Sequence, residues 1–290
     1  MKGAPVGIFD SGLGGLSIMR ALMSELPEYS YVYLGDSQRA PYGSLDSETM
    51  YRYTIQAIQY LFEQSKCRLV IVACNTVSAV VLRRLQQKWL ANNYPDRRVL
   101  GILVPTIEHV TGIDWETGKR EGRAFSSVGV LATEATVESG MYKKEILERT
   151  SSASVVQIAC PALVPLIEHG ASRDELGSAV DECITRLNIT SKKKNGRGWP
   201  EALILGCTHY SLIADIIDER VDGDTKIFDQ PRHVALATRQ YLREHPEIDE
   251  QLDRKASRVY ETTGNAKEVT DIANRLAGGA LISFKHVELP

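Results

Sequence analysis

Short apolar runs alternate with longer segments of helical periodicity along this chain. Many of the short runs are β-branched and apolar throughout, which is typical of strands covered on both faces, as in a parallel sheet. In the longer segment that begins at Ser47, the expected N-cap, Met50, Thr54, Ile58 and Leu61 fall on one helical face. The strands that we expect are residues 6–9, 31–35, 69–73, 99–104, 128–132, 155–159, 202–206, 226–229, 258–262 and 280–284.

This alternation of strands and helices predicts an α/β protein built on parallel sheets. About ten strands is many for one sheet, so we expect two domains. Two polar segments, 112–127 and 191–200, interrupt the pattern and are interpreted as surface insertions. The second contains the basic run KKKNGR, which we interpret as a solvated loop rather than a phosphate or nucleic-acid site.

Composition narrows the class of protein further. The 290 residues are 43% hydrophobic and carry a net charge of -3, which gives no reason to expect nucleic acid or an anionic membrane as a partner. The N-terminus lacks a secretory apolar core, and no run approaches the ~18 apolar residues of a membrane helix. None of the five cysteines forms a CxxC pair, so we expect free thiols in a reducing compartment, the cytoplasm.

Two of the five cysteines occupy matching positions in the pattern. The segment LVIVACNTVSAVV (69–81) aligns with ALILGCTHYSLIA (202–214), so Cys74 and Cys207 each follow an apolar strand and precede a helix. Ligands of open α/β sheets bind at the carboxyl ends of strands, and a helix N-terminus favours an anion. The helix contributes only ~0.3–1 kcal/mol, less than one pKa unit, so a cysteine base also needs nearby partners.

Polar residues at other strand ends supply candidate partners. His209, two residues after Cys207, is interpreted as a proton relay in preference to a core imidazole or a zinc ligand, because no second Cys/His pair has zinc spacing. Asp10 and Ser11 precede the Gly12–Gly15 turn, which matches neither GxGxxG nor a P-loop. A capping role for Asp10 stays open.

Further strand ends carry weaker signals. Asp36 follows the second expected strand, and Tyr42 is either a packed aromatic or a pocket wall. Cys160 also follows a strand, but Pro161 removes a backbone donor there, so we expect Cys160 to be structural. Glu168 closes the next short helix and is expected to face the cleft. Cys67 and Cys183 are expected in the core.

Five motifs together resemble one family. FDSGLGG, GDSQRAPYG, ACNT, ACPALVPLIE and GCTHY occur in the order and spacing of the glutamate racemases of the aspartate/glutamate racemase superfamily, and the likeness covers nearly the whole chain. It implies two flavodoxin-like α/β domains with the active site in the cleft between them. Residues 1–104 and 230–290 would form the first domain, and residues 105–229 the second.

The resemblance also implies the chemistry. It points to a two-base amino-acid racemase without cofactor or metal, which interconverts L- and D-glutamate and supplies D-glutamate for peptidoglycan. By motif match, Cys74 and Cys207 are the bases, Asp10 and His209 their partners, and Asp36 and Glu168 further acidic groups. Substrate binding falls, by the same match, to Asp10, Ser11, Tyr42, Gly43, Asn75, Thr76, Thr208 and His209. The superfamily likeness also implies a homodimer.

Several features keep rival functions open. Gln38, Ser211 and the segment FDQPRHVA (228–235) depart from the usual family motifs, so the substrate could be aspartate or another amino acid. Cys207 with His209 could serve a hydrolase as nucleophile and base, although a separation of two residues makes a hydrogen-bonded pair awkward. A non-catalytic binding protein on the same fold is the third possibility.

Overall fold

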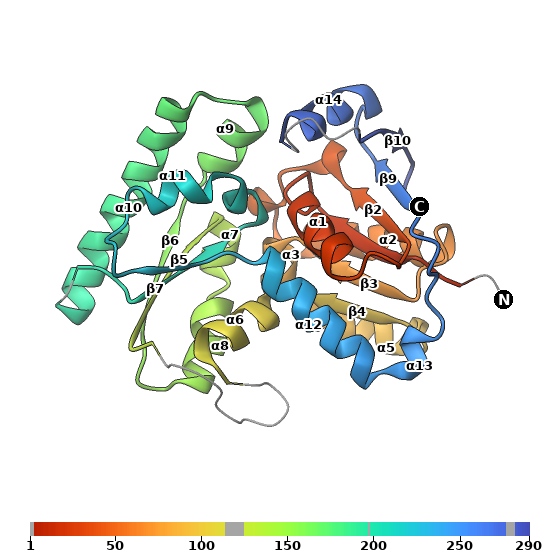
Figure 1. Cartoon of the computed structure of the whole chain (residues 1–290), viewed down its shortest axis with the longest axis horizontal. Coiled ribbons are helices and arrows are strands. Elements are labelled where there is room, and N and C mark those ends of the chain that lie inside the picture. The colour runs from red at the N-terminus through yellow and green to blue at the C-terminus, as the bar shows by residue number, and fades with distance from the viewer. Residues whose placement is uncertain (1–2, 114–124, 197, 277–281) are drawn as a thin grey trace.

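The computed structural model describes residues 3–113, 125–196, 198–276 and 282–290, and these form two lobes, each built on one parallel sheet (Figure 1). One sheet has the strand order β10-β9-β2-β1-β3-β4, and the other has the order β6-β5-β7-β8. All pairs of neighbouring strands within these two sheets run parallel. The predicted fold class is therefore confirmed.

The strands of the six-stranded sheet are β1 (Val6–Asp10), β2 (Tyr31–Gly35), β3 (Leu69–Val72), β4 (Arg98–Gly101), β9 (Arg258–Thr262) and β10 (Phe284–His286). The strands of the four-stranded sheet are β5 (Ser127–Ala132), β6 (Ser154–Ala159), β7 (Ala202–Gly206) and β8 (Lys226–Phe228). The first and last strands of the chain thus share one sheet. This layout supports the domain division that we propose, with residues 1–104 and 230–290 in one domain and residues 105–229 in the other.

The helices of the first lobe are α1 (Leu16–Glu25), α2 (Ser47–Glu63), α3 (Asn75–Val80), α4 (Leu82–Arg84), α5 (Ala91–Asn93), α12 (Pro231–Glu244), α13 (Pro246–Asp249) and α14 (Ala266–Leu276). Those of the second are α6 (Leu103–Thr111), α7 (Glu134–Glu138), α8 (Met141–Arg149), α9 (Leu163–His169), α10 (Arg173–Asn195) and α11 (Ala214–Asp218). Short 3₁₀ turns span η1 (Ser37–Arg39), η2 (Tyr42–Ser44) and η4 (Thr208–Ile213), and a π-helical turn, η3, spans Leu85–Leu90.

Helices cover both faces of the six-stranded sheet. Ile8 of β1 packs in a core with Leu22 of α1 and Val234 of α12, whereas its neighbour Phe9 packs in a second core with Ile58 of α2. Each strand therefore needs apolar residues on both faces, which explains the unbroken apolar runs. Helix α12, which follows the second sheet in the chain, returns to pack on α1 of the first.

The predicted ends of two elements are wrong. The strand expected at 99–104 stops at Gly101, and α6 begins at Leu103, because Leu103, Ile107 and Val110 are buried at helical spacing. The expected N-cap at Ser47 is also wrong, since the carboxylate of Asp46 accepts the backbone N–H of Glu48 and of Thr49, both at 3.0 Å. The strand expected at 280–284 falls partly outside the described residues, and β10 is Phe284–His286.

The segment expected to be an insertion at 191–200 is largely the end of a helix. Helix α10 continues through Lys192, Lys193 and Lys194 and ends at Asn195, and its C-cap, Gly196, has a left-handed φ of 76°. Lysines in a last turn complement the negative end of the helix dipole, so the basic run stabilises a helix end rather than forming a loop. Residues 114–124 of the other expected insertion lie outside the described residues.

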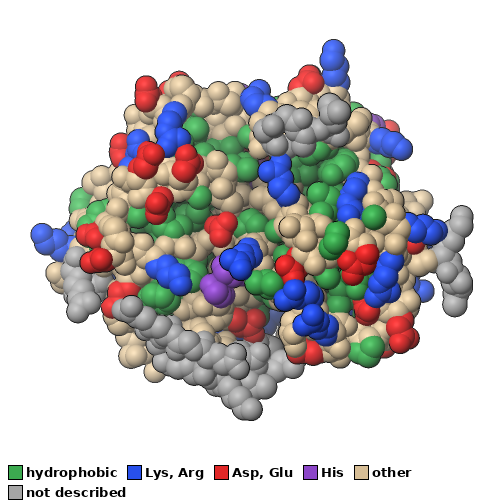
Figure 2. Space-filling view, in the orientation of Figure 1, with side chains coloured by type: hydrophobic (Ala, Val, Ile, Leu, Met, Phe, Trp, Pro, Cys, Tyr) green, Lys and Arg blue, Asp and Glu red, His purple; other side chains and the backbone are tan. Residues whose placement is uncertain are grey.

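The surface gives two further observations. In the described part of the chain, no helix combines the length and the apolarity that crossing a bilayer requires. Figure 2 shows acidic and basic side chains interspersed over the face that it presents.

Candidate functional site

A cavity of about 130 Å³ lies where strand ends of both sheets meet. It is lined by ten of the predicted site residues: Asp10, Ser11, Tyr42, Gly43, Cys74, Asn75, Thr76, Cys207, Thr208 and His209. A larger cavity, about 560 Å³, lies beside α6 and α12 and contains neither Cys74 nor Cys207. Chemistry rather than size therefore marks the smaller cavity, which lies between the two lobes, as the candidate active site.

Cys74 lies at the N-cap of α3 and is 6% exposed. Its Sγ is 3.4 Å from the Oγ of Ser11. Burial, and secondarily the charge of Asp10, raise the pKa of Cys74 to about 12. At neutral pH this cysteine is therefore a thiol, a proton donor rather than a base.

Cys207 has different surroundings. The Nδ1 of His209 lies 3.9 Å from its Sγ, and the Nε2 of His209 lies 2.8 Å from the Oε1 of Glu168. Burial alone lowers the pKa of His209, but the hydrogen bonds with Cys207 and Glu168 outweigh it and raise this pKa to about 10. His209 is therefore an imidazolium at neutral pH, and its positive charge lies beside the sulfur of Cys207.

The contact between Cys207 and His209 corrects our expectation that two residues of separation make such a pair awkward. Cys207 is in extended conformation (φ -145°, ψ 135°), and the 3₁₀ turn η4 begins directly after it at Thr208. At this change of chain direction the imidazole of His209 lies 3.9 Å from the sulfur of Cys207. Glu168 does not line the cavity and reaches it through His209. Burial alone would raise the pKa of Glu168, but the hydrogen bond and charge of His209 outweigh burial and lower it.

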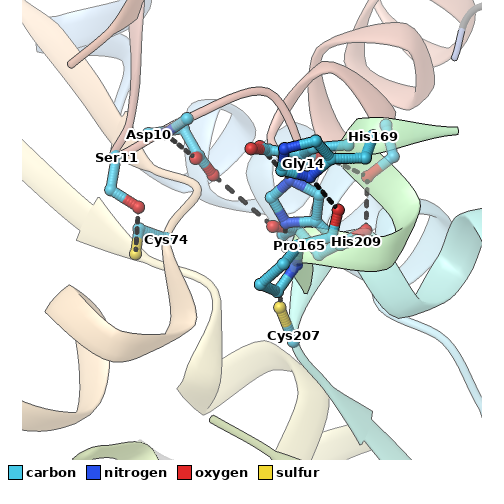
Figure 3. A network of polar contacts seen from close by, with 12 residues as sticks. Asp10, Ser11, Gly14, Cys74, Pro165, His169, Cys207 and His209 are labelled. Atoms are coloured by element: carbon cyan, nitrogen blue, oxygen red, sulfur yellow. Dashed lines mark hydrogen bonds and ion pairs between the residues drawn. The ribbon is translucent and has the colours of Figure 1, made fainter. Parts of the chain in front are cut away.

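Asp10 lies between the two cysteine environments (Figure 3). Its Oδ1 accepts the backbone N–H of Gly12 at 2.7 Å, and its Oδ2 accepts the hydroxyl of Thr208, from the other lobe, at 3.4 Å. Burial raises the pKa of Asp10, and the charge of His209 counters part of that rise. The carboxylate thus joins the end of β1 to the end of β7.

The glycine-rich turn after Asp10 has a steric role. A Cβ on Gly14 would lie 2.5 Å from the Nδ1 of His209, which is buried and held by Glu168. The turn therefore lets the first lobe approach His209 closely. This explains a glycine-rich turn that carries no phosphate-binding motif.

Asn75 and Thr76 follow Cys74 into the cavity wall. The Oγ1 of Thr76 lies 2.9 Å from that of Thr133, which follows β5 in the other lobe. The amide of Asn75 pairs with the amide of Gln230, and its Oδ1 also accepts the hydroxyl of Tyr142 at 2.7 Å. Sequence reasoning missed Thr133, Tyr142 and Gln230.

Two of these three residues had a signal in the sequence. Thr133 directly follows a strand, as Cys74 nearly does, and Gln230 lies within the unusual FDQPRHVA segment. Tyr142 had none, because it is one buried aromatic among many. Cys160, which we expected to be structural, is buried and also forms part of the cavity wall. Its hydrogen bond with Cys183, and then burial, raise its pKa.

Asp36 lies behind the cavity wall rather than in it. Its carboxylate accepts hydrogen bonds from Arg39 at 2.7 Å, from the hydroxyl of Tyr42 at 2.5 Å and from Thr263 at 2.7 Å. Tyr42 is both packed and part of the wall, so its two readings are compatible. The side chain of Asp36 therefore contacts the cavity wall through Tyr42.

Within the described residues, no group of three or more His, Cys, Asp or Glu side chains is placed to hold a metal ion. The cavity takes Cys74 from one parallel-sheet unit and Cys207 from the other, with a carboxylate near the first sulfur and an imidazolium near the second. Two acid–base groups at one cavity are what proton removal and return at a single carbon atom require, which is the chemistry of the amino-acid racemase class.

Comparison with known proteins gives the family. The family described as Asp/Glu/Hydantoin racemase matches residues 16–235, and the chain belongs to it. A glutamate racemase of Caulobacter sp. (strain K31) is 39% identical over 95% of this chain and 98% of that protein. A glutamate racemase of Phenylobacterium zucineum is 38% identical over the same shares.

Solved structures agree with this assignment. A glutamate racemase isoform from Bacillus anthracis superposes with a TM-score of 0.82 at 27% identity, covering 100% of this chain and 99% of that one. The glutamate racemase of Francisella tularensis, solved in complex with D-glutamate, gives 0.81 at 26% identity and covers 99% and 98%.

Proposed function

We propose that this chain is a cofactor-independent glutamate racemase that works with two cysteine bases. The observation that carries the proposal is the placement of Cys74 and Cys207, one from each lobe, at one cavity with opposite electrostatic surroundings. Glutamate is favoured by the relatives, which are named glutamate racemases and include one solved with D-glutamate. The small cavity suits a small ligand, since drug-sized ligands occupy sites of ~300–1,000 Å³.

The reaction needs a base on one face of Cα and an acid on the other. The Cys207 thiolate removes the α-proton, the C–H electron pair passes to Cα and the adjacent carboxylate, and the Cys74 thiol then gives its proton to the opposite face. Cys207 is left as a thiol and Cys74 as a thiolate, so the reverse reaction begins from the product state. His209 compensates the negative charge while it lies on Cys207.

The residues between the sulfurs provide donors and charge. Thr76 and Thr208 carry hydroxyls, and Asn75 an amide, at the cavity wall, where they can hold carboxylate oxygens and stabilise negative charge that develops during proton removal. Asp10 is buried between them and can orient the substrate ammonium group. Together with burial, the Asp10 carboxylate raises the pKa of Cys74. A raised pKa is what Cys74 needs in order to act as the acid before the first turnover.

The proposal is tested by solvent exchange. Purified protein is incubated in D₂O with L-glutamate or D-glutamate, and deuterium at Cα is followed by NMR while the enantiomers are separated by chromatography. We expect deuterium to enter the product enantiomer at the rate of racemisation. Exchange with aspartate or another amino acid but not with glutamate would overturn the substrate, and no exchange with any amino acid would overturn the racemase.

A Cys/His hydrolase is the second candidate, because the structure places Cys207 and His209 in contact. That reaction has no use for Cys74 on the other side of the cavity. The two candidates differ in the Cys74→Ser variant: a hydrolase retains activity on an amide or ester, whereas a racemase loses turnover. We further propose a homodimer on the strength of the superfamily likeness, and sedimentation equilibrium tests it.

A further inference from the structure

We propose that Gln230 and Thr106 are positioning residues that fix the orientation of the Asn75 amide, so that Asn75 presents an N–H donor to a substrate carboxylate. This inference rests on the proposed function. Gln230 does not line the cavity, whereas Asn75 does. The four side chains of the network, Asn75, Thr106, Tyr142 and Gln230, are each no more than 2% exposed.

Thr106 on α6 fixes the orientation of the Gln230 side-chain amide. Its hydroxyl donates to the backbone carbonyl of Ile102 at 2.7 Å, so its hydrogen is committed and only a lone pair faces Gln230. The Nε2 of Gln230 lies 3.0 Å from this oxygen and donates to it. A reversed Gln230 amide would place two oxygens against each other without a hydrogen, so Thr106 determines which end of Gln230 carries the donors.

Gln230 passes this orientation on to Asn75. With Nε2 turned toward Thr106, the Oε1 of Gln230 accepts the Nδ2 of Asn75 at 2.5 Å, while Nε2 also lies 3.0 Å from the Oδ1 of Asn75. Tyr142 supports the same arrangement, because its hydroxyl accepts from Gln230 at 3.0 Å and donates to the Oδ1 of Asn75 at 2.7 Å. The carbonyl of Asn75 therefore faces the network.

The side-chain amide of Asn75 keeps one hydrogen that the network does not use. The Nδ2 of Asn75 has two hydrogens, and the bond to Gln230 uses one of them. The second is the donor that we assign to the substrate carboxylate. A reversed Asn75 amide would present a carbonyl oxygen instead, which would repel a carboxylate. The network also joins α3 to α6, α8 and the start of α12, where the chain returns to the first lobe.

The test measures the Kd for D-glutamate by calorimetry and KM and kcat for racemisation. Loss of a hydrogen bond to a charged group weakens binding roughly 10–100-fold, so we expect Gln230→Met to raise Kd and KM by about that factor. Thr106→Val should act in the same direction, roughly 3–10-fold, and Thr106→Ser, which keeps the hydroxyl, should restore wild-type values.

Two controls separate positioning from general destabilisation. Thr111, five residues further along α6, is 2% exposed and donates to the carbonyl of Ile107 at 2.8 Å. The hydrogen bonds of the Gln230 side chain go to Asn75, Thr106 and Tyr142, so Thr111→Val should leave Kd unchanged. In an Asn75→Ala background, Gln230→Met and Thr106→Val should weaken binding no further.

Two results would overturn the inference: a Gln230→Met protein that unfolds at lower temperature yet keeps its Kd, or an equal loss of affinity in the Asn75→Ala background. Because Kd does not depend on turnover, a protein that binds glutamate without racemising it overturns the proposed function alone. A wild-type protein that binds no glutamate overturns both.

Discussion

The Nε2 of His209 lies 2.8 Å from the Oε1 of Glu168, and so ties the turn after β7 to the end of helix α9. The opposite nitrogen of the same ring faces Cys207. A single imidazolium therefore carries the electrostatic difference between the two cysteines.

Replacement of Glu168 by Gln should weaken the acid–base pair of Cys207 and His209. A neutral amide no longer holds the pKa of His209 at about 10, so His209 loses its proton at lower pH and the alkaline limit of kcat moves down. We expect roughly tenfold lower kcat near pH 8, measured as a pH–rate profile. Glu148→Gln, an exposed change on α8, is the control, and an unaltered alkaline limit in Glu168→Gln contradicts the assignment.

His209 should also make stability depend on pH. Its pKa is raised from an ordinary value near 6.5 to about 10 in the folded protein, so folding favours the protonated form. This contribution is complete below about pH 6.5 and is lost progressively as pH rises through about 10. The difference in unfolding free energy between wild type and His209→Gln should shrink from pH 6 to pH 10 in urea titrations. A constant difference would show that His209 is neutral in the fold.

Cys74 and Cys207 should both be essential. Cys74→Ser and Cys207→Ser each remove one proton-transfer group, and we expect each to lower kcat by roughly 10²–10⁴. Cys67→Ala is the control, because Cys67 is fully buried in the core and does not line the cavity. Racemisation that survives the change at Cys74 would point to a different acid.

Gly14 should not tolerate a side chain. In Gly14→Ala the new Cβ would lie 2.5 Å from the Nδ1 of His209, so the turn or the imidazole must move. Overpacking of this kind costs about 1–3 kcal/mol, and displacement of His209 should lower kcat as well. Gly223→Ala, where a Cβ meets nothing within 4 Å, should change neither thermal unfolding nor turnover.

Asp36 provides a test of our prediction that it is a catalytic group. Its carboxylate accepts three hydrogen bonds, so Asp36→Asn turns an amide N–H toward a donor and should cost about 1–3 kcal/mol of stability. If Asp36 only holds Tyr42, KM rises more than kcat falls, and Tyr42→Phe reproduces the change in KM. A large fall in kcat at unchanged stability would instead support direct participation.

The sequence by itself determined the layering and the reacting residues. Apolar runs such as 69–73 and 202–206 indicated strands covered on both faces, because period and burial are local properties of a strand. The repeat of a cysteine between strand and helix pointed to Cys74 and Cys207, since the carboxyl end of a parallel strand is fixed by chain direction alone.

Only the tertiary structure decided how those residues interact. Which of the two cysteines is paired with an imidazolium depends on Glu168 of α9, 41 residues from His209, and no local pattern encodes that approach. The same holds for Gln230 and Asn75, 155 residues apart, whose amides meet because α12 returns to the first lobe. Local sequence fixes the secondary structure and the strand ends, whereas packing between distant segments fixes charge, protonation and orientation.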